Sequence, residues 1–380
     1  MRFDLTEEQK LLEKDARNYC QGRFGRDALR EFVSKPFFNK ERWLEMANQG
    51  WLGAVVSEEH GGLGLGVGGI FPLLREAGKA LVPLPLWESG VVASLLLGEQ
   101  GDKDSGHRTL EALAEGRAIA TVALFEEADI VEPTCVSLTA RRDRDSFVLS
   151  GQKPIVAFGA DADWLIVLAR SDAGTTDLSG LTLFAVPANT PGVRATDLPM
   201  TDVTYRFAKV EFNEVPAAAG SVIGEVGNAA ALLQRVIPRA QVALCAEMLG
   251  GCDKVLEMCV EYSKQRIQFG RPIGSFQAIK HRLADMYLKV SAAQGLAYAA
   301  VKEVDNGGGA GSLVKVAKAM CNDAYRFITH EGVQVHGGIA FTWEHDMHLY
   351  FKRALRYRNT LGTSSRLMYE VGLALAGGGL

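Results

Sequence analysis

The chain has 380 residues, 47% of them hydrophobic and 23% charged, which is the composition of a globular protein with a sizeable core. Its net charge is −4 and its pI is about 6.0, so nothing supports a nucleic-acid partner or an anionic membrane surface, because both select a basic excess. No run of about 18 apolar residues is present, so no transmembrane helix is expected.

Residues 1–117 are predicted to be helical. Met1–Gln9 has no apolar signal-peptide core and leads into a helix, with Thr6 and Gln9 at the spacing of a capping box. The glycine-rich stretch Gly61–Gly66 separates two helices. It lacks the Gly-Lys-Ser/Thr ending of a phosphate loop and no strand clearly precedes it, so a helix break is the favoured interpretation.

Residues 118–224 have a different character. Short segments rich in β-branched and aromatic residues alternate with turn residues, which predicts a β-sandwich or barrel. Asp143, Asp145 and Gly151 are predicted to punctuate a hairpin. The expected strands are Ala118–Leu124, Val136–Arg141, Ser146–Ser150, Trp164–Arg170, Leu181–Val186 and Ala208–Phe212.

Helical periodicity returns over residues 225–380 and predicts a bundle of antiparallel helices. The stretch Asn306–Gly311 is predicted to link two of them. The order helical, β, helical argues against a Rossmann sheet, because strands do not alternate with helices. The expected helices are Ala230–Gln265, Phe276–Asn306, Leu313–His330 and Trp343–Leu375.

The six cysteines include no Cys-x-x-Cys pair. Cys245, Cys252 and Cys259 recur every seven residues and therefore share one helical face. A thiolate metal site is conceivable there, but buried structural cysteines in a reducing compartment are favoured. The run from His345 to His348 could offer two imidazoles and a carboxylate, but without further ligands no metal is expected.

Two segments of the last region carry residue types suited to a dinucleotide. Arg266 ends a long helix, and its planar guanidinium can donate two parallel hydrogen bonds to a diphosphate. Gly337 and Gly338 allow the backbone to approach a ligand closely. Taken singly, Arg266 could be a surface ion pair, His336 a packed histidine and the glycines a helix break. Their joint spacing through to Ser365 favours ligand binding.

With these segments the chain resembles the acyl-CoA dehydrogenase family over nearly its whole length, closest to the bacterial branch for bulky, steroid side-chain substrates. The resemblance implies an α+β multidomain fold with an N-terminal helical domain (1–117), a middle β-sandwich or barrel domain (118–224) and a C-terminal four-helix bundle (225–380). It also implies FAD between subunits and oxidation of an acyl-CoA to the 2,3-enoyl-CoA. A cytoplasmic homo- or hetero-tetramer with a related subunit is expected, with electron-transferring flavoprotein as electron acceptor.

The resemblance assigns the FAD contacts residue by residue. One group surrounds Arg266 and matches diphosphate and ring contacts. A second group follows Gln334 and matches the segment that reaches a neighbouring subunit's FAD, and a third follows Gly362 and matches the segment that holds the adenosine-side phosphates. The twelve residues are Arg266, Gln268, Phe269, Phe276, Gln277, Gln334, His336, Gly337, Gly338, Thr363, Ser364 and Ser365.

The reaction also needs a carboxylate base for the α-proton. The family places it directly before the Gly-Thr-Ser segment or early in the helix that starts near residue 235, and these positions hold Leu361 and Ala240 here. Glu247 is the remaining candidate, on nearly the same helical face as Ala240 and among apolar neighbours that would raise its pKa. It also lies in an Ala-Glu-x-x-Gly pattern that resembles the bulky-substrate branch. The alternative is a glutamate paired with Arg or Lys at a helix seam.

Three further departures concern the flavin ring and CoA. Ile155 replaces the tryptophan that stacks on the ring, Ala157 replaces a threonine hydroxyl, and Gln241 replaces the arginine that meets CoA. The segment Phe125–Pro133 also differs from the family's loop. Two hypotheses follow: an active dehydrogenase for a bulky or branched acyl-CoA, with a steroid-derived group as one candidate, or a non-catalytic partner subunit that completes a neighbour's FAD site.

Overall fold

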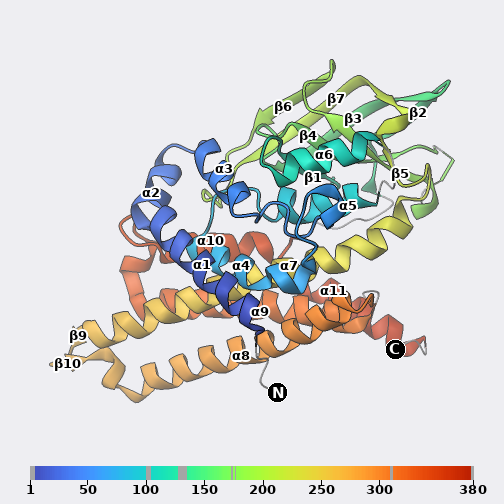
Figure 1. The fold of residues 1–380 in the computed structure, drawn as a ribbon. Helices are drawn as coiled ribbons and strands as arrows, with labels where there is room; N and C mark the ends of the chain where they lie inside the picture. Colours follow the sequence, from blue (N-terminus) through green and yellow to red (C-terminus); the bar gives the residue numbers. More distant parts are fainter. Residues whose placement is uncertain are drawn as a thin grey trace.

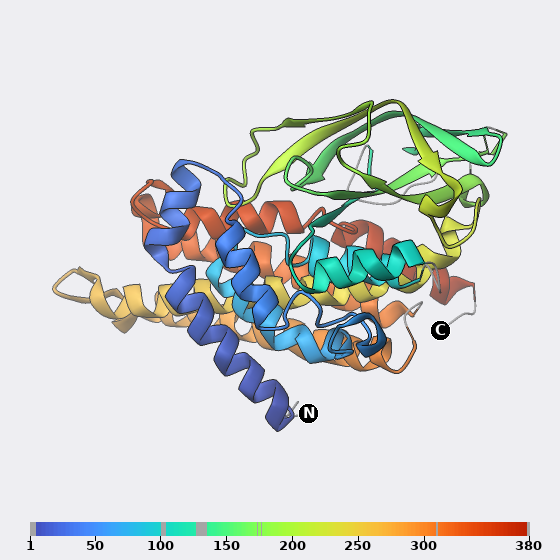
Figure 2. The same ribbon diagram turned by 45° about the horizontal axis from the view of Figure 1, so that its top comes forward.

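The computed structural model describes residues 5–99, 104–126, 135–172, 174–175, 177–308 and 311–377. N-terminal helices, a central sheet and a set of long C-terminal helices follow one another along the chain, as predicted (Figure 1). Figure 2 shows the sheet as a layer over the helices. In the described part of the chain, no helix combines the length and the apolar character needed to cross a bilayer.

The ends of the N-terminal helices are stabilised by side-chain hydrogen bonds, some from nearby residues and some from distant ones. Thr6 and Gln9 exchange side-chain hydrogen bonds with each other's backbone, which confirms the predicted capping box. The start of α4 has no side-chain cap of its own, and the Gly68 N–H donates instead to the carboxylate of Asp305, 3.1 Å away at the end of α8. The elements are α1 (Glu7–Arg23), α2 (Arg26–Ser34), α3 (Lys40–Asn48), α4 (Gly66–Ala80), η2 (Glu88–Ala93), α5 (Ser94–Gly98) and α6 (Asp104–Ala114).

The middle region forms one sheet in the order β6-β7-β3-β2-β4-β5-β8, with β1 parallel to β4. The predicted hairpin joins β2 to β3, but Gly151 does not end it: β3 continues through Gly151, whose φ of 138° marks an irregularity in the pairing with β7. The strands are β1 (Ala120–Ala123), β2 (Thr139–Asp143), β3 (Ser146–Ala157), β4 (Trp164–Arg170), β5 (Leu181–Pro187), β6 (Val193–Asp197), β7 (Phe207–Ala218) and β8 (Val222–Ile223).

Strand β4 is buried on both faces. Leu165 and Val167 pack into the core of the β-region, whereas Ile166 and Leu168 pack into the core shared with the helices. Because alternate side chains point to opposite faces of a sheet, a strand with two cores is apolar without interruption. The sheet is therefore held against the helical layers by hydrophobic packing.

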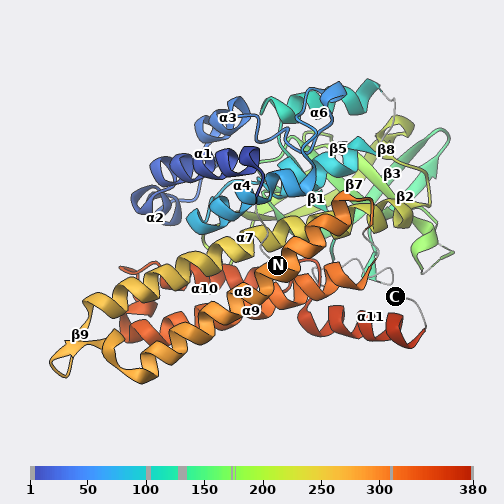
Figure 3. The same cartoon turned by 60° about the horizontal axis from the view of Figure 1, so that its bottom comes forward.

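The C-terminal helices run side by side, with the hairpin of β9 and β10 beyond one end (Figure 3). The prediction of one helix over Trp343–Leu375 is wrong. Two helices are separated by a turn in which Leu361 and Gly362 have φ values of 56° and 109°, which a helix cannot contain. The linker residues Gly309 and Ala310 lie outside the described residues. The elements are α7 (Ala229–Gln265), β9 (Ile267–Gln268), β10 (Arg271–Pro272), α8 (Gln277–Asp305), α9 (Ser312–His336), α10 (Met347–Tyr357) and α11 (Ser364–Ala376).

Helices α4 and α7 approach each other closely because glycines face the contact from both sides. A Cβ on Gly78 would lie 2.0 Å from the carbonyl oxygen of Glu247, and one on Gly250 would lie 1.9 Å from that of Arg75. The predicted cysteine face of α7 is buried, as expected, and the described residues contain only free cysteines. This packing fixes the middle of α7, where Glu247 lies.

Candidate functional site

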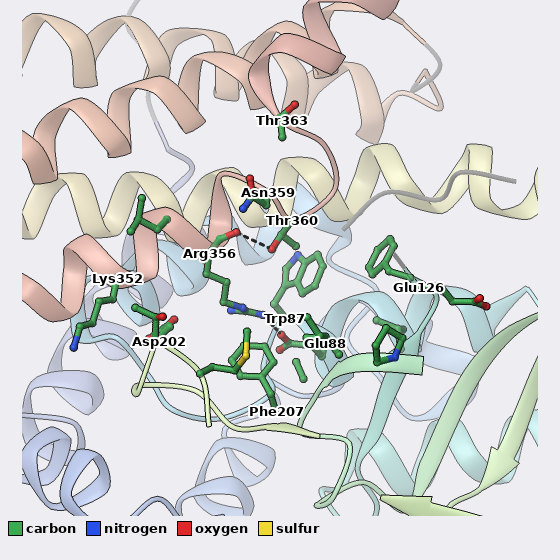
Figure 4. A pocket seen from close by; sticks show the side chains of 18 of the residues that line it. Trp87, Glu88, Glu126, Asp202, Phe207, Lys352, Arg356, Asn359, Thr360 and Thr363 are labelled. Carbon is green, nitrogen blue, oxygen red and sulfur yellow. Dashed lines mark hydrogen bonds and ion pairs between the residues drawn. The ribbon is translucent and has the colours of Figure 1, made fainter. Parts of the chain in front are cut away.

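A cavity of about 540 Å³ lies where the sheet meets the C-terminal helices (Figure 4). Its described wall comes from the start of η2, from β1 and β3, from residues 200–202, and from α10 with the turn that follows it. Apolar side chains such as Phe125, Met200 and Leu355 alternate there with charged ones. The cavity is thus built from parts of the chain that are far apart in sequence.

The helical side of the cavity is organised by η2, a π-helix. Such helices are rare and are frequently found at functional sites. Trp87, just before it, donates its indole N–H to the carbonyl oxygen of Ala240 on α7 at 2.9 Å. Glu88, its first residue, accepts from the Tyr205 hydroxyl at 2.9 Å and pairs with Arg356 at 3.0 Å. Figure 4 shows Arg356 reaching from α10 toward Glu88.

A second ion pair is buried beside the first. Arg353 donates to the carboxylate of Asp202 at 2.7 Å and to the carbonyl oxygen of Thr204 at 3.1 Å. It also donates to the Tyr357 hydroxyl at 3.2 Å. Positions three and four apart share a helix face, so α10 presents Arg353, Arg356 and Tyr357 together.

Glu247 belongs to this buried network. The Tyr357 hydroxyl donates a hydrogen bond to Oε2 of Glu247. Burial raises the pKa of Glu247 to about 7, against the opposing effects of the Tyr357 hydrogen bond and the charge of Arg353. Glu247 is not one of the described residues that line the cavity, whereas Arg356, whose guanidinium is 5.0 Å from the Tyr357 ring centre, is one. The carboxyl is therefore close to the cavity but enclosed.

The two positions where the family places its base hold no titratable group. Leu361 is buried in the turn between α10 and α11, and its carbonyl oxygen accepts a hydrogen bond from the Gln241 amide at 2.9 Å. Both residues line a second cavity of about 450 Å³ between α7 and α11. Ala240 is also buried, and its carbonyl holds the indole of Trp87.

The sheet side of the first cavity includes the two residues that depart from the family's ring contacts. Ile155 and Ala157 both line it, and Ile155 is largely exposed. Below them Lys153 is fully buried and pairs with Glu126 at 2.7 Å, and burial lowers the pKa of Lys153 to about 8. The residues from Glu127 to Pro133 lie outside the described part of the chain.

The hairpin after α7 presents the first group of predicted FAD contacts. Phe269 and Gly270 form its tip with φ values of 51° and 78°, the signs that a tight hairpin turn requires. Phe269 is 90% exposed, with only the edge of Phe276 beside it at 6.0 Å. Arg266 and Gln268 are exposed as well, and Arg266 has no ion pair among the described residues. An unpaired guanidinium beside an uncovered aromatic ring suits a ligand with a phosphate and a flat ring.

The second group lies next to this hairpin, at the end of α9. Gln334, Gly337 and Gly338 are exposed, and Gly337 has a φ of 67°. His336 is buried: its ring stacks on Tyr262 at 4.4 Å, and Nδ1 lies 2.8 Å from the carbonyl oxygen of Gly332. Burial lowers the pKa of His336, so the imidazole is held neutral under the segment.

The third group lies at the opposite end of the bundle. Thr363 lines the first cavity and caps α11, with its hydroxyl accepting from the Arg366 N–H. Ser364 and Ser365 form the first turn of that helix, where backbone N–H groups favour anions. Phe276 and Gln277 remain with the hairpin at the start of α8.

The separation between these groups follows from the length of α7. Gln241 touches the turn before Thr363, and Arg266 follows the last residue of the helix. At a rise of about 1.5 Å per residue the two are about 37 Å apart along the axis. The hairpin and the cavity of one protomer therefore lie toward opposite ends of α7.

No metal centre is found in the described residues, where no group of three or more His, Cys, Asp and Glu side chains comes together. Asp346 pairs instead with Arg30 at 2.8 Å, and the His345 ring accepts the Met347 N–H at 3.1 Å. The run from His345 to His348 therefore secures the start of α10 against α2.

Sequence reasoning missed the Trp87, Glu88, Arg356 and Tyr357 cluster. One signal was available: Glu88 is a lone acid in the long apolar run from Leu81 to Leu97. A buried glutamate needs a cationic partner, and the face of α10 that carries two arginines could have supplied it. The pairing itself depends on the tertiary fold.

Comparison with known proteins covers nearly the whole chain. It matches family models described as the N-terminal, middle and C-terminal domains of acyl-CoA dehydrogenase over residues 6–117, 126–215 and 230–374. It is 32% identical over 362 residues to the acyl-CoA dehydrogenase IpdE2 of Mycolicibacterium smegmatis, with 94% of this chain and 96% of that protein covered.

Two solved structures are similar to this chain over nearly its whole length. A variant of the Tcur3481–Tcur3483 steroid ACAD is 31% identical, with a TM-score of 0.88 and 99% of each chain covered. The ChsE4–ChsE5 complex from Mycobacterium tuberculosis is 28% identical, with the same TM-score and the same coverage.

Proposed function

Because this chain belongs to the acyl-CoA dehydrogenase family, which makes it an FAD-dependent oxidoreductase of acyl-CoA thioesters, we propose that its substrate is a bulky or branched acyl-CoA. Steroid-derived acyl groups are included, since a relative at 31% identity is a steroid ACAD. The product is the 2,3-enoyl-CoA, and electron-transferring flavoprotein is the proposed electron acceptor. The assembly is a tetramer with copies of itself or with a related chain.

The observation that carries the proposal is the division of the cofactor contacts. Arg266, Gln268 and Phe269 are exposed at one end of α7, whereas Thr363 and the start of α11 border the cavity at the other end. The donors fit a dinucleotide, with a free guanidinium and helix N–H groups for the diphosphate. One protomer's hairpin therefore serves the cavity of another protomer.

The reaction divides between the cofactor and this chain's residues. When bound, FAD supplies the acceptor for the hydride that leaves the β-carbon. The Glu247 carboxylate takes the α-proton at an oxygen, and its pKa near 7 suits a base that works at neutral pH. The apolar burial that raises this pKa also keeps water from the carboxyl.

Tyr357 controls the base in this mechanism. Its hydroxyl holds Oε2 of Glu247, and Arg353 holds the Tyr357 oxygen in turn. Since Glu247 is outside the cavity wall, proton transfer requires the Tyr357 hydroxyl to move away when the acyl group enters. The ion pairs of Arg353 and Arg356 anchor α10 during that movement.

A second candidate function is favoured by the ion pairs that the other carboxylates of the cavity form. Glu88, Glu126 and Asp202 line the cavity, and each is paired with a cation within 3.0 Å. The oxygens of these three carboxylates are held by cations rather than left open to a substrate. The chain would then be a non-catalytic partner subunit that lends its hairpin to a neighbour's FAD.

Spectroscopy of the purified protein separates the two functions. The active enzyme, purified alone, is yellow and bleaches anaerobically when a steroid-CoA thioester is added. The partner subunit is colourless alone and becomes yellow only with a co-expressed related chain. Native mass spectrometry of the same samples gives the partner, the stoichiometry and the bound flavin together. A chain that binds no flavin, either alone or with the co-expressed related chain, would contradict both functions.

A further inference from the structure

The turn between α10 and α11 forms part of the cavity wall and has a strained backbone. Asn359, Thr360 and Thr363 from this turn line the first cavity (Figure 4). Leu361 has a left-handed φ of 56°, which costs free energy in a residue that has a side chain. Such a conformation persists only where the surrounding structure fixes it. The contacts that hold this turn therefore also shape the cavity.

Lys318 on α9 holds the beginning of the turn. Its side chain is fully buried, and Nζ donates to the carbonyl oxygen of Tyr357 at 3.1 Å. Tyr357 is the last residue of α10, where the helix leaves its carbonyl groups without partners of its own, and a lysine can satisfy one of them. Lys318 thus fixes the backbone of the residue whose hydroxyl is bonded to Glu247.

Asn322 on the same helix holds the end of the turn. Its Nδ2 donates to the carbonyl oxygen of Gly362 at 3.1 Å, and its Oδ1 accepts from Nζ of Lys318 at 2.5 Å. Because the lysine only donates here, it orients the amide so that Nδ2 faces Gly362. Positions four apart share a helix face, so α9 presents both side chains to the turn together.

These two residues link the two parts of the site. We propose that Lys318 and Asn322 are positioning residues, which hold the Tyr357 and Gly362 carbonyls and thereby set the contact with the base and the cavity wall together. Neither is among the described residues that line the first or the second cavity, so both act through the turn. The inference rests on the proposed function, in which Glu247 is the base and the start of α11 borders the cofactor.

Asn322→Leu tests the cofactor side, because leucine has nearly the same shape and no hydrogen-bonding group. The loosened turn must be ordered again when the cofactor binds. FAD is therefore expected to bind about fivefold more weakly, the value of one hydrogen bond, in a fluorescence titration at one fixed protein concentration. The control is Thr329→Val, which removes a buried hydroxyl that donates to the Tyr325 carbonyl of the same helix at 2.8 Å. It should keep the wild-type affinity, and equal affinities in the two variants would overturn the proposal.

Lys318→Met tests the side of the base. The Tyr357 hydrogen bond lowers the pKa of Glu247, so loosening it raises that pKa. The rising limb of kcat/KM against pH is expected to move up by about one unit, the value of a hydrogen bond to a charged group, whereas Thr329→Val leaves it in place. In a Tyr357→Phe background the same substitution should add no further shift. An equal shift there would mean that the lysine acts directly by its charge, which contradicts positioning through Tyr357.

The outcomes distinguish this inference from the function on which it rests. If Lys318→Met or Asn322→Leu does not fold, Asn322→Asp decides: it keeps an acceptor for Lys318, removes only the donor to Gly362, and should weaken FAD binding to a similar degree. A wild-type protein that binds no FAD in any assembly contradicts the proposed function. A wild-type protein that binds FAD, with an Asn322 variant that binds it equally well, contradicts the positioning role alone.

Discussion

The Tyr357 hydroxyl is hydrogen bonded to the Glu247 carboxylate, which joins α10 to α7 in the buried core. Tyr357 ends the helix that also carries Arg353 and Arg356. The Glu247 carboxyl, whose pKa burial raises to about 7, is therefore held by the same helix that forms part of the cavity wall.

Replacing Glu247 by Gln keeps the size and the hydrogen-bond acceptor for Tyr357 but removes the base. Turnover is expected to fall by a factor on the order of 10² to 10⁴, the usual contribution of a general base, while FAD remains bound. Steady-state kinetics and the flavin absorbance measure both. The matched control is Glu76→Gln, a buried glutamate paired with Lys79 at 2.7 Å away from the cavity. Unchanged turnover in Glu247→Gln would remove this residue from the mechanism.

The raised pKa of Glu247 also predicts how stability depends on pH. The folded protein holds the proton up to about pH 7, whereas the unfolded chain releases it near the ordinary value of 4.5. The contribution of Glu247 is therefore fully present below pH 4.5 and is lost as the pH rises through 7, by about 3 kcal/mol in all. Urea unfolding of the wild type minus that of Glu247→Gln isolates it. A difference that is flat from pH 4 to pH 8 would show that the pKa is not raised.

Substitution of an exposed hairpin residue should weaken cofactor binding without destabilising the fold. Arg266→Ala is expected to weaken FAD retention by a factor on the order of 10 to 100, because one charge-assisted contact with the diphosphate is lost. Its unfolding free energy should stay within about 0.5 kcal/mol of wild type. Flavin content after gel filtration and urea unfolding give the two values. Lys264→Ala, on an exposed residue paired with Glu261, is the control and should keep its flavin.

Close packing of α4 on α7 should make Gly78 intolerant of a side chain. Gly78→Ala places a methyl group 2.0 Å from the Glu247 carbonyl oxygen and is expected to destabilise the protein by about 1–3 kcal/mol. Gly98→Ala, where a Cβ meets nothing within 4 Å, is expected to be neutral or slightly stabilising. Thermal unfolding of the two variants side by side checks the pair, and equal melting temperatures would contradict the close contact.

Local sequence patterns were enough to predict the order of the helical, β and helical regions along the chain. Helical spacing gave α7 to within one residue at its start, and the Thr6–Gln9 box gave the beginning of α1. The break between α10 and α11 was missed because Leu361, an ordinary helix former, takes a left-handed φ only in its tertiary setting.

The site could be predicted only in part, for a physical reason. Spacing along one helix places Glu247 among apolar neighbours, and burial does raise its pKa. That Tyr357 covers it, and that Glu88 meets Arg356, depends on contacts between residues more than a hundred positions apart. Where the twelve assigned cofactor residues lie relative to one another depends on the direction of α7, which no local pattern reports.

About 37 Å of helix α7 separates the two sets of predicted cofactor contacts, which predicts how the protein behaves on dilution. Under the proposed division of the cofactor contacts, each flavin is held only while two chains stay together, so dissociation of the assembly and release of the flavin are one equilibrium. Dilution should therefore turn a yellow solution into free flavin and colourless protein, and added flavin should raise the melting temperature more in concentrated samples than in dilute ones.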